Sequence, residues 1–243
     1  MVFKIISIFP EMLESILSVS IIGRAVKNGL ININYVNLRD YTEDKHKKVD
    51  DYPFGGGPGM LLKPEPMYRA IMDNKIEGTR VVYMSPKGKT LNQKLVEELS
   101  KEEDLLIIAG HYEGLDQRII DHYIDEVISI GDYVLTGGEL PAAVLVDAVG
   151  RLIPGVLSNE ESGMIESHSD ILLEHPQYTR PREFNGLVVP DVLLSGNHQR
   201  IQKWQRFKSL ETTINNRPDL ISERNDLMNE YHALKDYFDK DIK

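Results

Sequence analysis

Apolar and polar positions follow two regular patterns over the first 157 residues of the chain. Strands are predicted where apolar residues run together or alternate, at 2–9, 31–38, 80–85, 105–109 and 126–130. Helices are predicted where apolar residues recur with helical spacing, at 10–18, 21–28, 64–72, 91–99 and 138–152. The last helix is expected to bury Val144, Leu145, Ala148, Val149 and Leu152. Strands that alternate with helices indicate an α/β fold with a mostly parallel sheet.

The pattern changes after residue 157. Residues 158–170 (SNEESGMIESHSD) are polar and acidic without a sustained period, which is typical of a linker or loop. Helical spacing returns at 201–213 and 219–237, with Pro218 at a helix start. We therefore expect three parts: an α/β domain over 1–157, a linker over 158–170 and a small helical domain over 171–243.

Three predicted strands end in glycine-bearing turns. The turns read SPKG after residue 84, GHYEG after residue 109 and GDYVLTGG after residue 130. Because ligands of open α/β sheets bind outside the carboxyl ends of the strands, these turns form a candidate binding site.

A fourth glycine-rich segment, DDYPFGGGPGM, occupies residues 50–60. It is neither a Walker loop, because no Gly-Lys-Ser/Thr follows, nor a dinucleotide fingerprint, because the glycine spacing differs. From composition alone, this segment could also be a flexible surface loop, and composition does not identify a ligand for it.

Composition narrows the function classes. The chain has no cysteine, which excludes disulfides and thiolate chemistry. No apolar stretch approaches the ~20 residues of a spanning helix, so we expect a cytoplasmic protein without a membrane partner. The net charge of −10 argues against a general nucleic-acid coat. Residues 178–208 nevertheless contain six basic and two acidic residues, a local excess of 6 − 2 = +4 that is either an RNA footprint or a solvated helix face.

Seven separated motifs carry a resemblance that extends from end to end of the chain. They are DDYPFGGGPGM (50–60), SPKG (85–88), AGHYEGLDQR (109–118), ISIGDYVLTGGELP (128–141), RLIPGVL (151–157), PQYTRP (176–181) and VPDVLLSGNH (189–198). In length and in motif order, the chain resembles the bacterial tRNA (guanine-N1)-methyltransferases of the SPOUT, or trefoil-knot, superfamily.

The resemblance implies a fold and a reaction. The α/β domain would contain a deep trefoil knot, which connection rules alone would not propose. The enzyme would transfer a methyl group from S-adenosylmethionine to guanine N1 at position 37 of tRNA, 3′ to the anticodon, in a reaction that depends on Mg²⁺, although no metal-ligand spacing stands out in this sequence. It would act as a homodimer whose active site is shared between subunits.

The family's cofactor pocket maps onto the three strand-end turns. The expected cofactor residues are Tyr83, Ser85, Pro86, Gly88, Gly110, Tyr112, Ser129, Ile130, Gly131, Tyr133, Leu135, Gly137, Gly138 and Pro141. Contacts with the tRNA anticodon arm are expected at Gly55, Gly57 and Gly59, and in the helical domain at Arg180, Ser195 and His198.

Methyl transfer to guanine N1 needs a group that accepts the N1 proton and a cation that stabilises charge at O6. The resemblance implies Arg151 as that cation, with an ion pair to Asp147 as its alternative interpretation, and places Glu113 near the reacting groups. The family's aspartate base is absent. Alignment puts Glu166 in its place, His168 in place of an aromatic residue and Ile171 in place of a glycine.

Glu166 is therefore the candidate base and Asp170 the second choice. Glutamate retains the carboxylate but moves it by about one methylene, and a displacement of ~1 Å can cost ~100-fold in rate. The departures at these positions leave a catalytically weakened SPOUT-type RNA-binding protein as the alternative function. An unrelated α/β nucleotide-binding enzyme would require the motif matches to be accidental.

Overall fold

The computed structural model describes residues 1–157, 167 and 171–240. The chain divides into two compact units, Met1–Ser158 and Asn159–Lys243. In the described parts of both units, every helix is too short or too polar to cross a bilayer.

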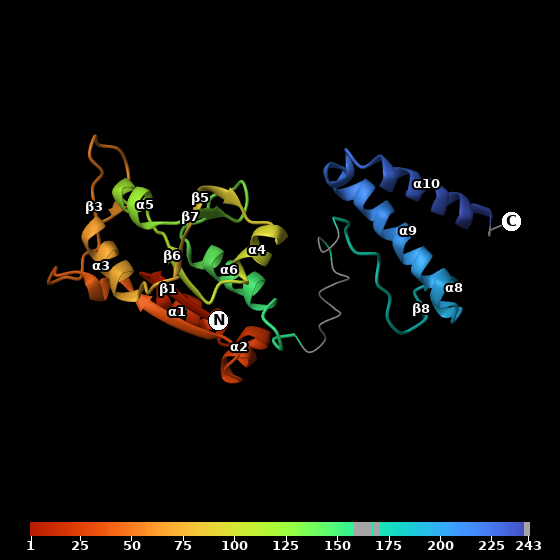
Figure 1. Cartoon of the computed structure of the whole chain (residues 1–243), viewed down its shortest axis with the longest axis horizontal. Helices are drawn as coiled ribbons and strands as arrows, with labels where there is room; N and C mark the ends of the chain where they lie inside the picture. Colours follow the sequence, from red (N-terminus) through yellow and green to blue (C-terminus); the bar gives the residue numbers. More distant parts are fainter. Residues whose placement is uncertain (158–166, 168–170, 241–243) are drawn as a thin grey trace. The chain divides into compact units, whose positions relative to one another are not determined.

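The first unit is built on a five-stranded sheet (Figure 1). Its strands lie in the order β2 (Asn32–Asn37), β1 (Val2–Ser7), β6 (Asp104–Ala109), β5 (Arg80–Thr90) and β7 (Glu126–Ser129). Each neighbouring pair is parallel. The prediction of an α/β fold with a mostly parallel sheet is thus confirmed.

Helices cover both faces of this sheet. One face packs against α1 (Pro10–Leu17), α2 (Ser20–Lys27), α4 (Gln93–Leu99) and α6 (Glu139–Gly150). The other packs against α3 (Pro64–Asn74), α5 (Gln117–Tyr123) and the 3₁₀ helix η1 (Leu38–Tyr41). Along the central strand β6, Leu105 and Ile107 face the first layer, whereas Leu106 and Ile108 face the second. Burial on both faces explains why this strand is an unbroken apolar run.

Local sequence sets the helix starts. The Asn92 side chain accepts a hydrogen bond from the Leu95 N–H at 3.0 Å, and the Asp116 side chain accepts one from the Arg118 N–H at 2.9 Å. Pro10 and Pro64 occupy the first turns of α1 and α3, where a missing N–H is tolerated. These caps and prolines therefore fix the residues at which the turns end and the helices begin.

Two details of the prediction for the first unit are wrong. Strand β5 does not end at Ser85: after a register shift between Met84 and Lys89 it continues, and Lys89 and Thr90 pair with β7. Val144 is 45% exposed instead of buried, because it lies on the outer face of α6, opposite Leu145 and Val149.

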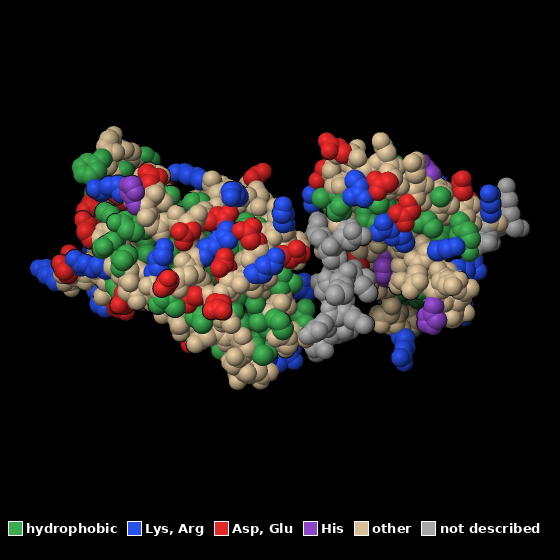
Figure 2. All heavy atoms as spheres, viewed as in Figure 1, with side chains coloured by type: hydrophobic (Ala, Val, Ile, Leu, Met, Phe, Trp, Pro, Cys, Tyr) green, Lys and Arg blue, Asp and Glu red, His purple; other side chains and the backbone are tan. Residues whose placement is uncertain are grey.

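The second unit is mainly helical. It contains a hairpin of β8 (Glu183–Phe184) and β9 (Leu187–Val188), followed by α8 (Asp191–Leu194), α9 (His198–Asn216), the 3₁₀ helix η2 (Pro218–Ile221) and α10 (Asn225–Lys240). Its core contains Leu172, Leu210, Ile221 and Leu227. A continuous helix over 219–237 is therefore wrong, because the segment divides into η2 and α10. Basic and acidic side chains are intermixed on the face of this unit seen in Figure 2.

A charged cluster surrounds the amino-terminal end of β5. Arg80 donates to Glu98, Glu102 and Glu126 at 2.9, 3.2 and 2.6 Å, and Lys89 lies 3.2 Å from Glu126. Burial opposes the charge of Arg80, but its bonds to the three carboxylates outweigh burial and raise the pKa of the guanidinium. The side chain of Glu126 is only 7% exposed, so it depends on these partners.

We expect Arg80→Met to lower the free energy of unfolding by about 3 kcal/mol, because it leaves a buried carboxylate without its main partner. Lys89→Met is the matched control: its side chain is 79% exposed, so the loss should stay below about 1 kcal/mol. Urea unfolding of the full chain measures both. Equal losses for the two variants would contradict this account of Glu126.

Candidate active site

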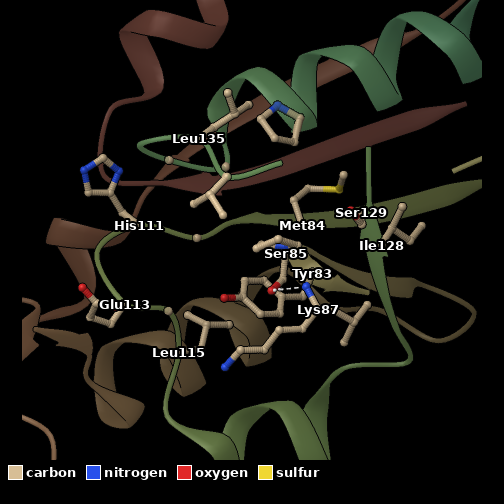
Figure 3. A pocket seen from close by; sticks show the side chains of 18 of the residues that line it. Tyr83, Met84, Ser85, Lys87, His111, Glu113, Leu115, Ile128, Ser129 and Leu135 are labelled. Atoms are coloured by element: carbon tan, nitrogen blue, oxygen red, sulfur yellow. Dashed lines mark hydrogen bonds between the residues drawn. The ribbon is translucent and has the colours of Figure 1, made fainter. Parts of the chain in front are cut away.

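The segment of β5 at its register shift and the turns after β6 and β7 enclose a cavity of about 670 Å³. This volume is in the range of ~300–1,000 Å³ that small-molecule sites occupy. The cavity is lined by every expected cofactor residue except Gly88, that is, by Tyr83, Ser85, Pro86, Gly110, Tyr112, Ser129, Ile130, Gly131, Tyr133, Leu135, Gly137, Gly138 and Pro141. Figure 3 shows the β5 residues opposite the turn that carries His111 and Glu113. Three segments far apart in sequence thus meet at one end of the sheet.

Gly88 does not line the cavity. A Cβ atom at this position would lie 2.5 Å from the Val127 backbone. Gly88 therefore lets β5 lie directly against β7, in agreement with the continuation of that strand to Thr90.

The β5 wall combines a buried phenol with a polar turn. Tyr83 is 5% exposed, and burial raises the pKa of its phenol despite interactions with the Ser85 side chain and the Leu115 backbone. The phenol is therefore neutral at physiological pH and can donate a hydrogen bond. Ser85 Oγ accepts a bond from the Lys87 N–H at 3.3 Å, drawn dashed in Figure 3.

The opposite walls are formed by backbone at close range. The Gly138 N–H donates to the Gly110 carbonyl at 2.6 Å. A Cβ at Gly110 would lie 2.7 Å from the Tyr83 ring, and one at Gly131, where φ is +151°, would lie 2.5 Å from the Tyr133 ring. The cavity thus offers apolar surfaces and backbone hydrogen-bonding groups with little room for further side chains, which fits a flat heteroaromatic ring and its ribose.

Glu113 lines the same cavity and contacts the glycine-rich loop. Its N–H donates to the Met60 carbonyl at 2.9 Å. A Cβ at Gly59 would lie 2.4 Å from Glu113 Cγ, so the side chain occupies the space that this glycine leaves. A candidate catalytic acid and a candidate RNA-binding loop are therefore in direct contact.

The glycine-rich loop connects the paired strands β3 (Asp50–Asp51) and β4 (Leu61–Leu62). Gly55, Gly57 and Gly59 adopt φ of +86°, +121° and +86°, values that glycine accommodates without strain. Phe54 at its tip is fully exposed. The loop therefore presents backbone groups and two aromatic side chains, Tyr52 and Phe54, to the surface.

The other candidate residues are distributed differently. Arg151 follows the end of α6, and it does not line the cavity. Glu166, His168 and Asp170 lie outside the described residues. Ile171, where the resemblance leads us to expect a glycine, has φ +62°, a conformation that a β-branched residue rarely adopts and glycine adopts readily. In the second unit, Arg180, Ser195 and His198 are all exposed.

Several cavity residues were not expected from the sequence, among them Lys87, His111, Leu115 and Gln117. Lys87 and His111 fall inside the quoted motifs, so their position next to glycine turns was the available signal. Leu115 and Gln117 also fall inside a quoted motif, at 109–118, just before and at the start of α5. In the described ranges, no group of three or more His, Asp or Glu side chains could hold a metal ion.

Known sequences resemble the chain over nearly all of its length. The model of the family described as "tRNA (Guanine-1)-methyltransferase TrmD" matches residues 1–223. A tRNA (guanine-N(1)-)-methyltransferase of Ruminiclostridium cellulolyticum is 57% identical over 225 residues, covering 91% of this chain and 97% of the relative. Those of Alkaliphilus oremlandii and Staphylococcus carnosus are 55% and 52% identical, covering 92% and 98% of this chain and 93% and 97% of the relatives. The chain belongs to the tRNA (guanine-1)-methyltransferase TrmD family.

Proposed function

We propose that this protein methylates N1 of guanine 37 in tRNA, 3′ to the anticodon, with S-adenosylmethionine as the methyl donor. The observation that carries the proposal is the single cavity in which three separate family motifs meet, next to Glu113 and the glycine-rich loop. When bound, S-adenosylmethionine supplies an electrophilic methyl group on a sulfonium. Because the substrate is tRNA, we place the activity in the cytoplasm.

The protein's own residues would prepare the acceptor. Guanine N1 carries a proton and is a poor nucleophile, so a carboxylate must accept that proton while a cation stabilises charge at O6. We assign the first role to Glu166, with Asp170 as the second choice, and the second role to Arg151. The positive φ of Ile171 supports the alignment, because the family has glycine there.

The position of Arg151 supports a shared active site. Helix α6 begins at the cavity and has twelve residues, so its far end lies roughly 18 Å away, which exceeds the reach of an arginine side chain. Arg151 would therefore serve the cavity of a second subunit. Helices α1 and α6 pack together and carry exposed apolar pairs, Met12 with Ile16 and Leu140 with Val144, which suit a homodimer interface.

The chain path supports a trefoil knot. Strand β7 is at the edge of the sheet beside β5, yet α6 packs against the more central β6 and β1. The connecting residues 130–138 must cross the end of β5 and meet the turn after β6, where Gly138 bonds Gly110. This crossing next to the β5 bulge is the region in which we place the knot.

For RNA recognition we propose the glycine-rich loop and the exposed Arg180, Ser195 and His198. The fully exposed Phe54 gives the loop an aromatic surface for a base. Because N1 lies on the pairing edge of guanine, the target base would leave its stack to react. Mg²⁺ is expected from the family, and none of the residue roles proposed for this chain requires it.

Single-turnover transfer of labelled methyl from S-adenosylmethionine to unmodified tRNA tests the proposal. We expect Glu166→Ala to reduce the rate by ~100-fold or more, the range of general-base contributions, and Glu166→Asp to retain activity. Asp170→Ala is the control and should have little effect. A large loss of rate in Asp170→Ala alone would identify Asp170 as the base instead of Glu166. Wild-type protein that binds S-adenosylmethionine without transferring methyl would instead be a binding protein.

A second prediction concerns the contact between the loop and Glu113. Gly59→Ala should lower the single-turnover rate by up to about 100-fold, because the new methyl group displaces the acid. Gly56→Ala is the matched control: it also requires positive φ, but its methyl group would have nothing within 4 Å. Equal rates for the two variants would show that the contact between Gly59 and Glu113 does not affect methyl transfer.

The third prediction concerns assembly. Val144→Glu should raise the dimer dissociation constant roughly 30-fold or more, as expected for a charge buried in an interface. Met72→Glu is the control, since Met72 is similarly exposed but lies on α3 at the opposite face of the sheet. Sedimentation equilibrium measures both. A dimer unaffected by Val144→Glu would place the interface elsewhere.

A further inference from the structure

A buried carboxylate lies where the ends of β1 and β6 meet the start of α6. Glu139 is 2% exposed, and its Oε1 accepts a hydrogen bond from Ser7 Oγ at 2.8 Å. Ser7 Oγ in turn accepts a bond from the Phe9 N–H at 2.9 Å. A buried carboxylate is costly unless it is bonded, and the first turn of a helix favours its charge. One carboxylate oxygen of Glu139 thus has a hydrogen-bond donor within the fold.

The other oxygen faces a histidine. Glu139 Oε2 lies 3.7 Å from His111 Nδ1, close enough for an ion pair but too far for a hydrogen bond. His111 Nδ1 is buried and has no hydrogen-bond partner among the described residues. A Cβ on Gly137 would lie 2.3 Å from Oε2 and 2.6 Å from Nδ1, so only glycine there lets the two groups approach.

His111 belongs to the turn that forms one wall of the cavity. It forms an isolated bridge with Gly137 in the opposite wall, and its carbonyl accepts the Gly114 N–H at 3.1 Å. Its ring packs edge-on against Phe9 and Tyr112 at centroid distances of 5.2 and 5.0 Å. Tyr112 has φ +58°, which is uncommon for a non-glycine residue and must be held by its neighbours. The ring of His111 is therefore one of the contacts that support this turn beside Glu113.

We propose that Glu139 is a positioning residue for the cofactor pocket. Its carboxylate accepts a hydrogen bond from His111 Nδ1–H, selects that tautomer, and holds the 110–114 turn against the loop of Gly137 and Gly138. A shift of less than about 1 Å from the present 3.7 Å would close the bond. Glu139 acts through His111 and does not itself line the cavity. The inference rests on the proposed function, because the ligand used to test it is S-adenosylmethionine.

Glu139→Gln in the full chain tests this role. Glutamine keeps the shape and a hydrogen-bonding atom for Ser7, but its amide N–H can bond His111 Nδ1 and favour the other tautomer. We expect the S-adenosylmethionine dissociation constant, from calorimetry, to rise about tenfold, the factor equivalent to one charge-assisted hydrogen bond. The ¹⁵N signals of the His111 ring in the cofactor-bound protein should change from the Nδ1–H to the Nε2–H pattern.

Glu126→Gln is the matched control. Glu126 is also a buried glutamate of the first unit, but it lies at the amino-terminal end of β7 with Arg80 and Lys89. This variant should lower the melting temperature and leave the dissociation constant and the His111 signals unchanged. A double-mutant cycle adds His111→Ala, in whose background Glu139→Gln should have little further effect on binding.

The outcomes are distinct. Weaker binding and a changed tautomer in Glu139→Gln alone support the positioning role. An unchanged dissociation constant, an unchanged His111 tautomer, or a full Glu139→Gln effect without His111 would overturn it and leave Glu139 a buried structural residue. Failure of the wild-type protein to bind S-adenosylmethionine would overturn the proposed function and this role together.

Discussion

The backbone contact between Gly110 and Gly138 is the constraint on which the cavity depends. The 2.6 Å bond joins the turn after β6 to the loop after β7, although β5 lies between these strands in the sheet. A Cβ at Gly138 would lie 2.6 Å from the Gly110 nitrogen. Only glycine therefore allows the loop to cross β5 and to begin α6 beside the centre of the sheet. The three walls of the cavity, and the place of Glu139 beside His111, follow from that crossing.

Much of this arrangement could be predicted from the sequence because it depends on local features. Buried parallel strands are apolar on both faces, and β6 could be recognised from residues 105–109 for that reason. Glycines mark turns where backbone approaches backbone, so the positions of Gly110, Gly131 and Gly137 near one site could be anticipated from the carboxyl-end rule. The expectation of a knot and of the reaction rests on the resemblance, since neither periodicity nor composition indicates them.

What could not be predicted depends on non-local packing. The continuation of β5 to Thr90 requires pairing with β7, and Gly88 faces that strand instead of the cavity for the same reason. Val144 reads as a core residue because apolar character alone does not distinguish a core from an outer helix face. His111 and Lys87 lie next to glycine turns inside the quoted motifs, but only the packing of the three walls shows that they line the cavity.

The residues expected to bind the cofactor and those proposed to act on the guanine lie in different parts of the chain. The cavity is formed by turns anchored on buried strands, where a displaced side chain would meet close-packed neighbours. Arg151 follows the far end of α6, and Glu166 lies outside the described residues. The glycine turns tolerate little change, because a Cβ added at Gly110, Gly137 or Gly138 would lie within 3 Å of another segment. The close packing of these turns therefore constrains the pocket in the same way whether the proposed proton acceptor is a glutamate or an aspartate.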